Sequence, residues 1–447
     1  MLPIVEVPES IRRGMAHYRS VFCRREGFDQ VCRYVTGLVV SPNKTLQGIH
    51  DLQVWEEPKP SRRAMHEAVF EANWDDDQLM KEHRGVVSRD HQGRGREVIS
   101  LDWTLSHHER GPKIYATTRA WDYVNQCYSR FQTVVTAAIA NRQYIDGLEV
   151  KAQEPQVWKK ELASLKTTCQ EGYSQREQAQ SRLLEVLKYL LHRKQYRKRT
   201  EIAVELARQI EEEGPFPEAS YAFDSAVLTL ELARLIEGAG KHWVSALQSN
   251  RQVQWRGEWK RVDAVARELR EQHPESFREV RPRCRNGEEK TCFAFTKGVR
   301  LRRYGRKRVV IVHEKEDLQD APRFLLTDAL HWESKRVMEN WSFRWSIEVF
   351  HEFSKQVTGL ESAQVRKEEA VKRHFRLSCV AQSLLQRAPV SGVTSERFAF
   401  VKDKQGSIGQ RCRGIIRELL KGVLQLAKNL FEQGRSCDEV LEVLMPA

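Results

Sequence analysis

Four residues in the last third of the chain bring together one carboxylate, two cations and an indole ring. They are Trp341, Arg344, Glu348 and Lys355, and the last three are offset from Trp341 by three, seven and fourteen positions. At about 100° per residue, a helix places these side chains within roughly 60° of one another. A carboxylate can bind a divalent metal ion, and cations beside it can bind phosphate oxygens. The same spacing also fits a plain amphipathic helix whose charged face is solvated.

Large apolar side chains occupy the opposite side of this predicted helix. They are Phe343, Ile347, Phe350, Phe353 and Val357. Such a stripe is expected to pack against the protein core. The charged face would then point away from the core, where a substrate can reach it.

Two aspartates close short apolar runs that are typical of buried strands. Asp102 ends the run 98–102, and Asp224 ends the run 219–224. A chain with 61 acidic residues contains many Asp–Asp–Glu combinations, so the set carries weight only through its context. That context is two strand ends followed by the helix of Glu348.

The helical motif also resembles the signature of a known family. Tyr-x2-Arg-x3-Glu-x6-Lys marks a large group of bacterial insertion-sequence DDE transposases, the YREK type, which have an RNase H-like core. This chain has Trp341-x2-Arg344-x3-Glu348-x6-Lys355, with Trp in place of Tyr. The following segment, 359–366, is similar to the family as well.

The resemblance extends over most of the chain, from about Phe28 to Leu385. It includes Asp102-Trp103-Thr104, which looks like the family's first-acid motif. The resemblance therefore implies an RNase H-like fold, in which two strand ends and a helix bring their acids together.

The resemblance implies that Asp102, Asp224 and Glu348 are both the catalytic and the metal-binding residues. The implied cofactor is Mg²⁺, as two ions, and Mn²⁺ is expected to substitute. Transfer of a phosphodiester develops charge on the attacking and leaving oxygens, and two ions about 4 Å apart can stabilise both. Mg²⁺ prefers carboxylate oxygens and water as ligands.

Each acid has an ordinary alternative role. Asp102 could be a turn residue at a strand end, and Asp224 could cap a helix predicted at 226–237. Glu352 lies one turn beyond Glu348 on the same face. Only the family spacing selects Glu348 over Glu352.

The charge of the chain indicates a polyanionic partner. Lys and Arg number 74 against 61 Asp and Glu, which gives a net charge of +13 and favours nucleic acid. A basic run from Arg281 to Arg308 is predicted to track DNA, with a solvated hairpin as the alternative. The residues expected to contact DNA are Trp341, Arg344, Lys355, Arg302, Arg303, Arg306 and Lys307.

Two tryptophans, Trp255 and Trp259, precede this basic run. In some transposases of this kind, an aromatic residue of the insertion stacks on a flipped base. Core packing is the more ordinary role for both residues.

Hydrophobic periodicity predicts an α/β protein with an RNase H-like catalytic core. Strand candidates at 131–140 and 145–152 form a β-meander with 98–102. Short β-like runs dominate from about 250 to 330 and predict a β-rich insertion. The predicted segments are a helical N-terminal DNA-binding region (1–96), the first part of the core (97–249), the β-rich insertion (250–332), the completion of the core with the Glu348 helix (333–390) and a helical C-terminal tail (391–447).

Taken together, the sequence predicts a cut-and-paste DNA transposase that cleaves transposon ends and transfers strands into target DNA. The alternatives are an RNase H-like nuclease without strand transfer and a repurposed DNA-binding protein. The expected partners are double-stranded DNA and a second copy of the chain. Residues 1–10 do not resemble a signal peptide, and no apolar run has membrane-spanning length. A cytoplasmic, bacterial, nucleoid-associated location without membrane contact is therefore expected.

Overall fold

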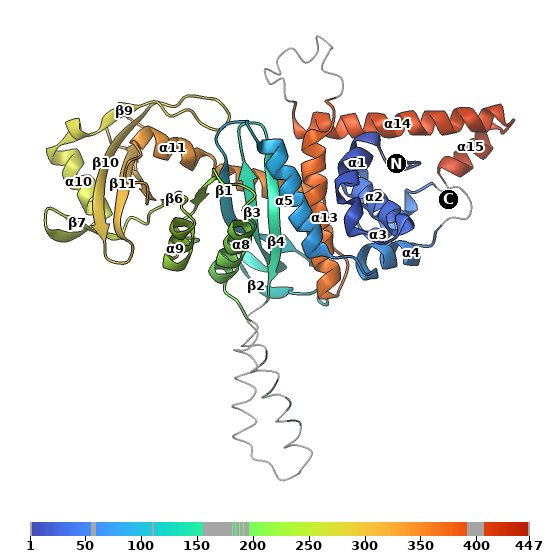
Figure 1. The fold of residues 1–447 in the computed structure, drawn as a ribbon, viewed down its shortest axis with the longest axis horizontal. Helices are drawn as coiled ribbons and strands as arrows, with labels where there is room; N and C mark the ends of the chain where they lie inside the picture. The colour runs from blue at the N-terminus through green and yellow to red at the C-terminus, as the bar shows by residue number, and fades with distance from the viewer. Residues whose placement is uncertain are drawn as a thin grey trace.

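One mixed sheet of twelve strands forms the centre of the molecule, with helices on both faces (Figure 1). The computed structural model describes residues 2–54, 60–109, 111–154, 196–390 and 406–445, together with Ser181, Leu184, Leu187 and Leu191. The expected mixed α/β architecture with helical ends is confirmed. None of the described helices is long and apolar enough to span a bilayer.

The first strands form an antiparallel meander, as the sequence predicts. β1 (Val98–His107) pairs with β3 (Cys127–Ala140), and β3 pairs with β4 (Ile145–Gln153). The additional strand β2 (Thr118–Asp122) pairs with the beginning of β3. The apolar residues on both faces of these strands are buried, which explains their nearly continuous hydrophobic pattern.

Two short parallel strands extend the sheet on the other side of β1. β5 (Ser220–Phe223) pairs with β1, and β6 (Trp243–Ala246) pairs with β5. α8 (Arg199–Glu213) precedes β5, and α9 (Leu230–Gly238) connects β5 to β6. The order β4-β3-β1-β5-β6 thus joins an antiparallel half to a parallel half.

The remaining strands continue the same sheet beyond β6. Two of the short β-like runs expected from about 250 to 330 join into one strand, because residues 296–298 stay in the ladder with the following strand, 305–313. A helix, α10 (Val262–Gln272), lies within this segment and was not predicted. The strands are β7 (Gln252–Trp255), β8 (Glu258–Arg261), β9 (Arg278–Val280), β10 (Cys292–Leu301), β11 (Gly305–His313) and β12 (Arg323–Thr327).

Helices cover the two faces of the sheet in separate groups. One face packs against α8, α9 and α10 in the largest apolar cluster. The other face packs against α11 (Ser334–Ser342), α12 (Trp345–Gln356) and α13 (Glu368–Arg387). Phe343, Ile347 and Phe350 of the predicted apolar stripe are buried, whereas Phe353 and Val357 are partly exposed.

The N-terminal helices share one core with α13 and with the C-terminal helices (Figure 1). The tail contains α14 (Ile408–Glu432) and α15 (Cys437–Leu444), and residues 391–405 of the predicted tail lie outside the described part. The N-terminal elements are α1 (Glu9–Met15), η1 (Ala16–Val21), α2 (Arg25–Val40), α3 (Leu46–Asp51), α4 (Arg62–His66), the π-helical turn η2 (Glu67–Glu71) and α5 (Asp76–His91).

Buried ion pairs fasten these helices to β4. The guanidinium of Arg84 lies 3.2 Å from Glu149, and Arg376 on α13 contacts the same carboxylate at 3.1 Å. Arg387, the last residue of α13, contacts Asp146 at 2.8 Å. Asp146 and Glu149 are almost fully shielded from solvent, so both carboxylates depend on these arginines for stabilisation.

The Asp146 pair predicts a specific pH dependence of stability. Burial alone would raise the pKa of Asp146, but the charge of Arg387 and hydrogen bonds from His91 and Arg387 hold it far below its usual value. A depressed folded-state pKa contributes stability that is present above the unfolded pKa of about 3.9 and is lost as the pH falls. Asp146→Asn should cost about 3 kcal/mol at neutral pH, measured by urea unfolding.

The difference between wild type and Asp146→Asn should then shrink by roughly 1.4 kcal/mol for each pH unit below about 4. Glu67→Gln is the control, since Glu67 forms an exposed pair with Arg63 and should change stability by less than about 0.5 kcal/mol. A pH-independent difference for Asp146→Asn would contradict the assignment.

Candidate active site

Asp102 and Asp224 lie on neighbouring strands at the point where the parallel ladder ends. The last paired residues of β1 and β5 are Leu101 and Phe223. Asp102 is the next residue of β1, and Asp224 directly follows β5. The prediction that Asp102 ends its strand is wrong, because β1 continues to His107 through its antiparallel pairing with β3.

The charged motif is divided between two helices. A single continuous helix was predicted, but α11 ends at Ser342 and α12 begins at Trp345. Backbone N–H groups of Phe343 and Arg344 donate to carbonyls three residues earlier, which tightens the chain between the helices. Trp341 therefore lies on α11, whereas Glu348 and Lys355 lie on α12.

Arg344 joins two of the three predicted acids. Its guanidinium donates to Asp224 at 3.1 Å and to Glu348 at 2.6 Å. The Arg344 side chain is 14% exposed, and its charge lies against the ring of Trp341 at 5.3 Å. The indole ring of Trp341 therefore provides a surface against which the guanidinium rests.

The third acid, Asp102, belongs to the same electrostatic cluster. Burial raises its pKa to about 6, and the negative charges of Asp224 and Glu348 act in the same direction. A hydrogen bond from the Trp103 N–H and the charge of Arg344 oppose this rise. The fold thus brings all three predicted acids and Arg344 together.

The alternative roles of these acids are less well supported. Thr229, not Asp224, caps α9 through its side chain. Glu352 is exposed, and the charge acting on Asp102 comes from Glu348. The structure thus places Glu348, and not Glu352, with Arg344 and Asp102.

The donor set suits a hard divalent cation, but the carboxylates are arranged around a guanidinium. Three carboxylates provide the oxygen ligands that Mg²⁺ or Mn²⁺ prefers. Within the described ranges, no three His, Cys, Asp or Glu residues are placed to hold a metal ion together. Arg344 supplies the positive charge between Asp224 and Glu348 that a cation would otherwise supply.

Lys355 lies about two turns of α12 beyond Glu348 and is held by partners that the sequence did not identify. Its ammonium group donates to the carbonyl of Leu105 at 2.5 Å and lies 3.0 Å from Glu361 in the short helix η4 (Leu360–Ser362). Glu361 also lies 3.6 Å from His107 at the end of β1. No spacing rule relates Glu361 to β1, so only the fold reveals this contact.

The predicted basic arm is not one surface. Arg302, Arg303 and Arg306 are exposed at the turn between β10 and β11. Lys307 is buried and paired with Glu237 at 3.1 Å, because strand alternation turns its side chain toward α9. Its expected position on a DNA-facing surface is therefore wrong.

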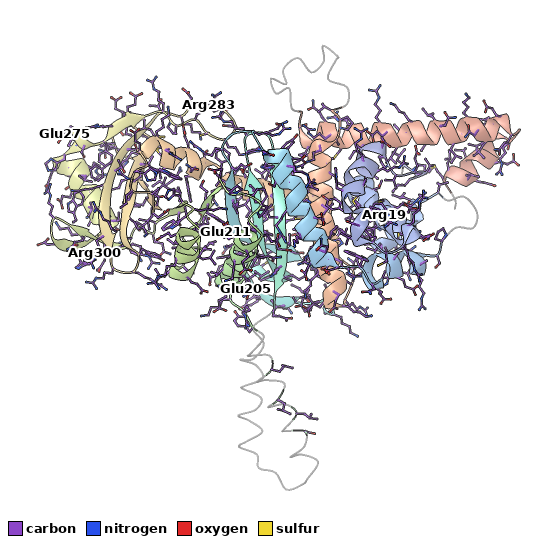
Figure 2. The ribbon with its side chains drawn as sticks, in the orientation of Figure 1. Arg19, Glu205, Glu211, Glu275, Arg283 and Arg300 are labelled. Carbon is purple, nitrogen blue, oxygen red and sulfur yellow. The ribbon has the colours of Figure 1, made fainter. Side chains whose placement is uncertain are left out.

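Other basic residues of the run also have separate locations. Figure 2 shows Arg283 and Arg300 at opposite edges of this part of the molecule. Trp255 is buried against Phe295, as core packing predicts, whereas Trp259 is partly exposed beneath Arg302. Arg302, Arg303 and Arg306 are thus exposed together at the β10–β11 turn, while Arg281, Arg283 and Lys290 are exposed elsewhere.

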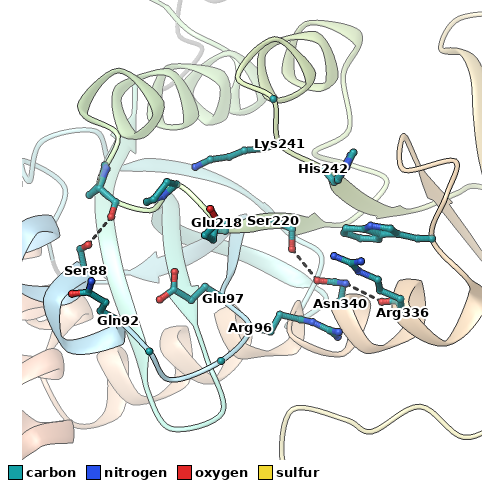
Figure 3. A pocket seen from close by; sticks show the side chains of 17 residues that line it. Ser88, Gln92, Arg96, Glu97, Glu218, Ser220, Lys241, His242, Arg336 and Asn340 are labelled. Carbon is teal, nitrogen blue, oxygen red and sulfur yellow. Dashed lines mark hydrogen bonds between the residues drawn. The ribbon is translucent and has the colours of Figure 1, made fainter.

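A cavity of about 690 Å³ lies at the opposite end of the parallel strands (Figure 3). Its lining includes Glu97 before β1, Ser220 at the start of β5 and His242 before β6. Ser220 donates to Asn340 of α11 at 2.8 Å, which ties this helix to the sheet. None of the three clustered acids lines this cavity.

Comparison with known proteins identifies one family. The family model described as "Transposase DDE domain" matches residues 143–384, more than half of the chain. The match contains Asp224, Arg344 and Glu348 and begins after Asp102. No curated protein matches the chain. The extent of the family match, together with the clustered acids, shows that this protein belongs to the DDE transposases.

Proposed function

We propose that this protein cleaves transposon ends and transfers the strands into target DNA by a cut-and-paste mechanism. The observation that carries the proposal is the convergence of Asp102, Asp224 and Glu348 around Arg344. A nuclease that only hydrolyses DNA would share this site but would not join strands.

An RNase H-like core is part of the proposal. The strand order β4-β3-β1-β5-β6, with three antiparallel and two parallel strands, supports it. Asp102 and Asp224 follow the last paired residues of the parallel ladder, and Glu348 lies on a helix on one face of the sheet. In this assignment residues 250–332 are a β-rich insertion, although their strands continue the core sheet.

Asp102, Asp224 and Glu348 would hold two Mg²⁺ ions, with Mn²⁺ as a substitute. When bound, the ions stabilise charge on the attacking and leaving oxygens of the phosphodiester. Arg344 must leave its position between Asp224 and Glu348 to free both carboxylates. Its guanidinium would then be available for a phosphate oxygen, for which its planar fork is well suited.

The remaining assignments concern DNA and a second protomer. Lys355, about two turns of α12 beyond Glu348, is proposed to contact the phosphate backbone. Residues 1–96 are proposed as a DNA-binding region, and Arg302, Arg303 and Arg306 as a further contact. Exposed Leu424 and Phe431 on α14 support a contact between two protomers in the active complex.

Charge removal at the three acids tests the catalytic assignment. Asp102→Asn, Asp224→Asn and Glu348→Gln keep the size of each side chain but lose the negative charge that binds metal. Mg²⁺-dependent nicking of a supercoiled plasmid that carries the DNA flanking the gene should fall by at least about a thousandfold. DNA binding should persist, since removing a carboxylate lessens repulsion with phosphate.

Glu352→Gln is the matched control and should retain most of the nicking activity. Strand joining to a second plasmid distinguishes a transposase from a nuclease. Normal cleavage by all three acid variants would make this site assignment untenable, and wild-type cleavage without joining would favour the nuclease.

Replacing Arg344 tests whether its guanidinium occupies the place of a cation. Arg344→Gln leaves Asp224 and Glu348 without their shared positive charge, so the Tm should fall in EDTA. Mn²⁺ should then raise the Tm of the variant by more than that of the wild type, because no guanidinium has to be displaced. Equal Mn²⁺-induced shifts in a differential scanning experiment would argue against this competition.

The exposed arginines at the β10–β11 turn should add affinity that does not depend on DNA sequence. Each phosphate contact contributes about −0.9 to the slope of log K against log salt concentration. Replacing Arg302, Arg303 and Arg306 by Ala should flatten this slope by up to roughly 2.7 units.

Arg267→Ala combined with Arg278→Ala is the control, because these exposed residues lie away from the turn. The slope of the control should match that of the wild type. If the triple variant also matches it, the turn does not face DNA.

A further inference from the structure

The hairpin formed by β2 and the beginning of β3 exposes large apolar side chains at its tip. Trp121, Tyr123, Val124 and Tyr128 are 38 to 80% exposed. Trp121 and Tyr128 face each other across the two strands, with their ring centroids 5.4 Å apart in an edge-to-face arrangement. We call residues 118–131 the aromatic hairpin.

The buried side chain of Asp122 holds the tip of the aromatic hairpin in a defined conformation. The buried side chain of Asp122 accepts hydrogen bonds from the backbone N–H groups of Val124 at 2.8 Å and Asn125 at 3.2 Å. Its second oxygen lies 2.8 Å from a ring nitrogen of His107 on β1. The exposed rings are therefore displayed by a fixed turn, so little ordering is needed when they bind a partner.

The surroundings of these rings are basic. Arg119 and Arg130 pair directly across the strands, two positions from Trp121 and Tyr128 on the same face. Within the described part of the chain, neither arginine forms an ion pair. The only acid between residues 111 and 131 is Asp122, which is buried. Exposed aromatic rings beside unpaired arginines are complementary to nucleic acid.

The aromatic hairpin lies on the same face of the sheet as Asp102. Asp102 pairs with Thr136 of β3, and Tyr128 lies eight residues from Thr136, an even number that keeps the side chains on one face. Eight residues of a strand span about 26 Å. DNA rises 3.4 Å per base pair, so the hairpin lies about eight base pairs from the acids.

We infer that the aromatic hairpin is a second DNA contact, at which Trp121 and Tyr128 stack on unpaired or unstacked bases while Arg119 and Arg130 bind the adjacent phosphates. The inference rests on the proposed function, because it extends the path of the DNA held at the acids. Every base presents a π face, so this contact recognises DNA distortion and not base sequence. A contact with a second copy of the chain would instead be expected to offer acids or an uncharged surface opposite Arg119 and Arg130.

Binding to distorted DNA tests the inference without any cleavage. The full chain in EDTA is titrated with a fully paired duplex and with the same duplex carrying a short mismatched bubble. The wild type should bind the bubble about tenfold more tightly. Trp121→Ala combined with Tyr128→Ala should remove this preference and leave affinity for the paired duplex nearly unchanged. Trp121→Phe combined with Tyr128→Phe should retain it.

Two further variants complete the experiment. Leu441→Ala removes an exposed apolar side chain elsewhere and should keep the preference for the bubble. Arg119→Gln combined with Arg130→Gln should weaken both duplexes alike and flatten the salt dependence by up to roughly 1.8 units. Equal binding of bubble and paired duplex by the wild type, or an unchanged preference in the double alanine variant, would overturn the inference.

Light scattering without DNA tests the alternative that a second copy of the chain occupies this surface. If the double alanine variant dissociates an oligomer that the wild type forms, the hairpin is a contact between copies and the inference is wrong. Plasmid nicking in Mg²⁺ is measured separately on the wild type. If the wild type nicks DNA normally but shows no preference for the bubble, only this inference is contradicted. If it prefers the bubble but does not nick DNA, only the proposed catalytic function is contradicted.

Discussion

The ion pairs between β4 and α13 are the interaction on which the rest of the structure depends. Asp146 and Glu149 are buried carboxylates, and an unpaired buried charge costs several kcal/mol. Arg376 and Arg387 of α13 meet these two acids, which fixes both the position and the rotation of the helix. α13 in turn packs against α12 and against the N-terminal helices. The helix that carries Glu348 is therefore positioned by charges remote from the acids it joins.

The cluster of Asp102, Asp224 and Glu348 brings like charges together, whereas the ion pairs of β4 and α13 join opposite charges. Like charges brought together destabilise a fold, and here one cation, Arg344, compensates Asp224 and Glu348. Among the described residues Asp102 forms no ion pair, and burial raises its pKa to about 6, which favours the neutral form of this third acid. In the proposed function, Asp224 and Glu348 would exchange the guanidinium of Arg344 for a divalent cation.

The sequence predicted features that depend on local periodicity. The apolar stripe of Phe343, Ile347 and Phe350 followed from helical spacing, and the strand that ends before Asp224 followed from an apolar run closed by an acid. Features that depend on residues distant in the sequence could not be predicted from local periodicity. β1 continues past Asp102 only because β3 pairs with it, and Lys307 turns inward only because Glu237 lies opposite. A basic run is visible in a sequence, but the face of each residue depends on strand register.

The net charge of +13 therefore has two parts with different physical roles. Arginines such as Arg84 and Arg376 are buried and form ion pairs with acidic residues of the fold, where solvent and DNA cannot reach them. Arg302 and Arg119 are exposed on turns and strand edges, where their charge acts on the solution. Only the second group contributes to the field that attracts a polyanion. Composition counts both groups equally, so the DNA-facing surface has to be located from burial and pairing.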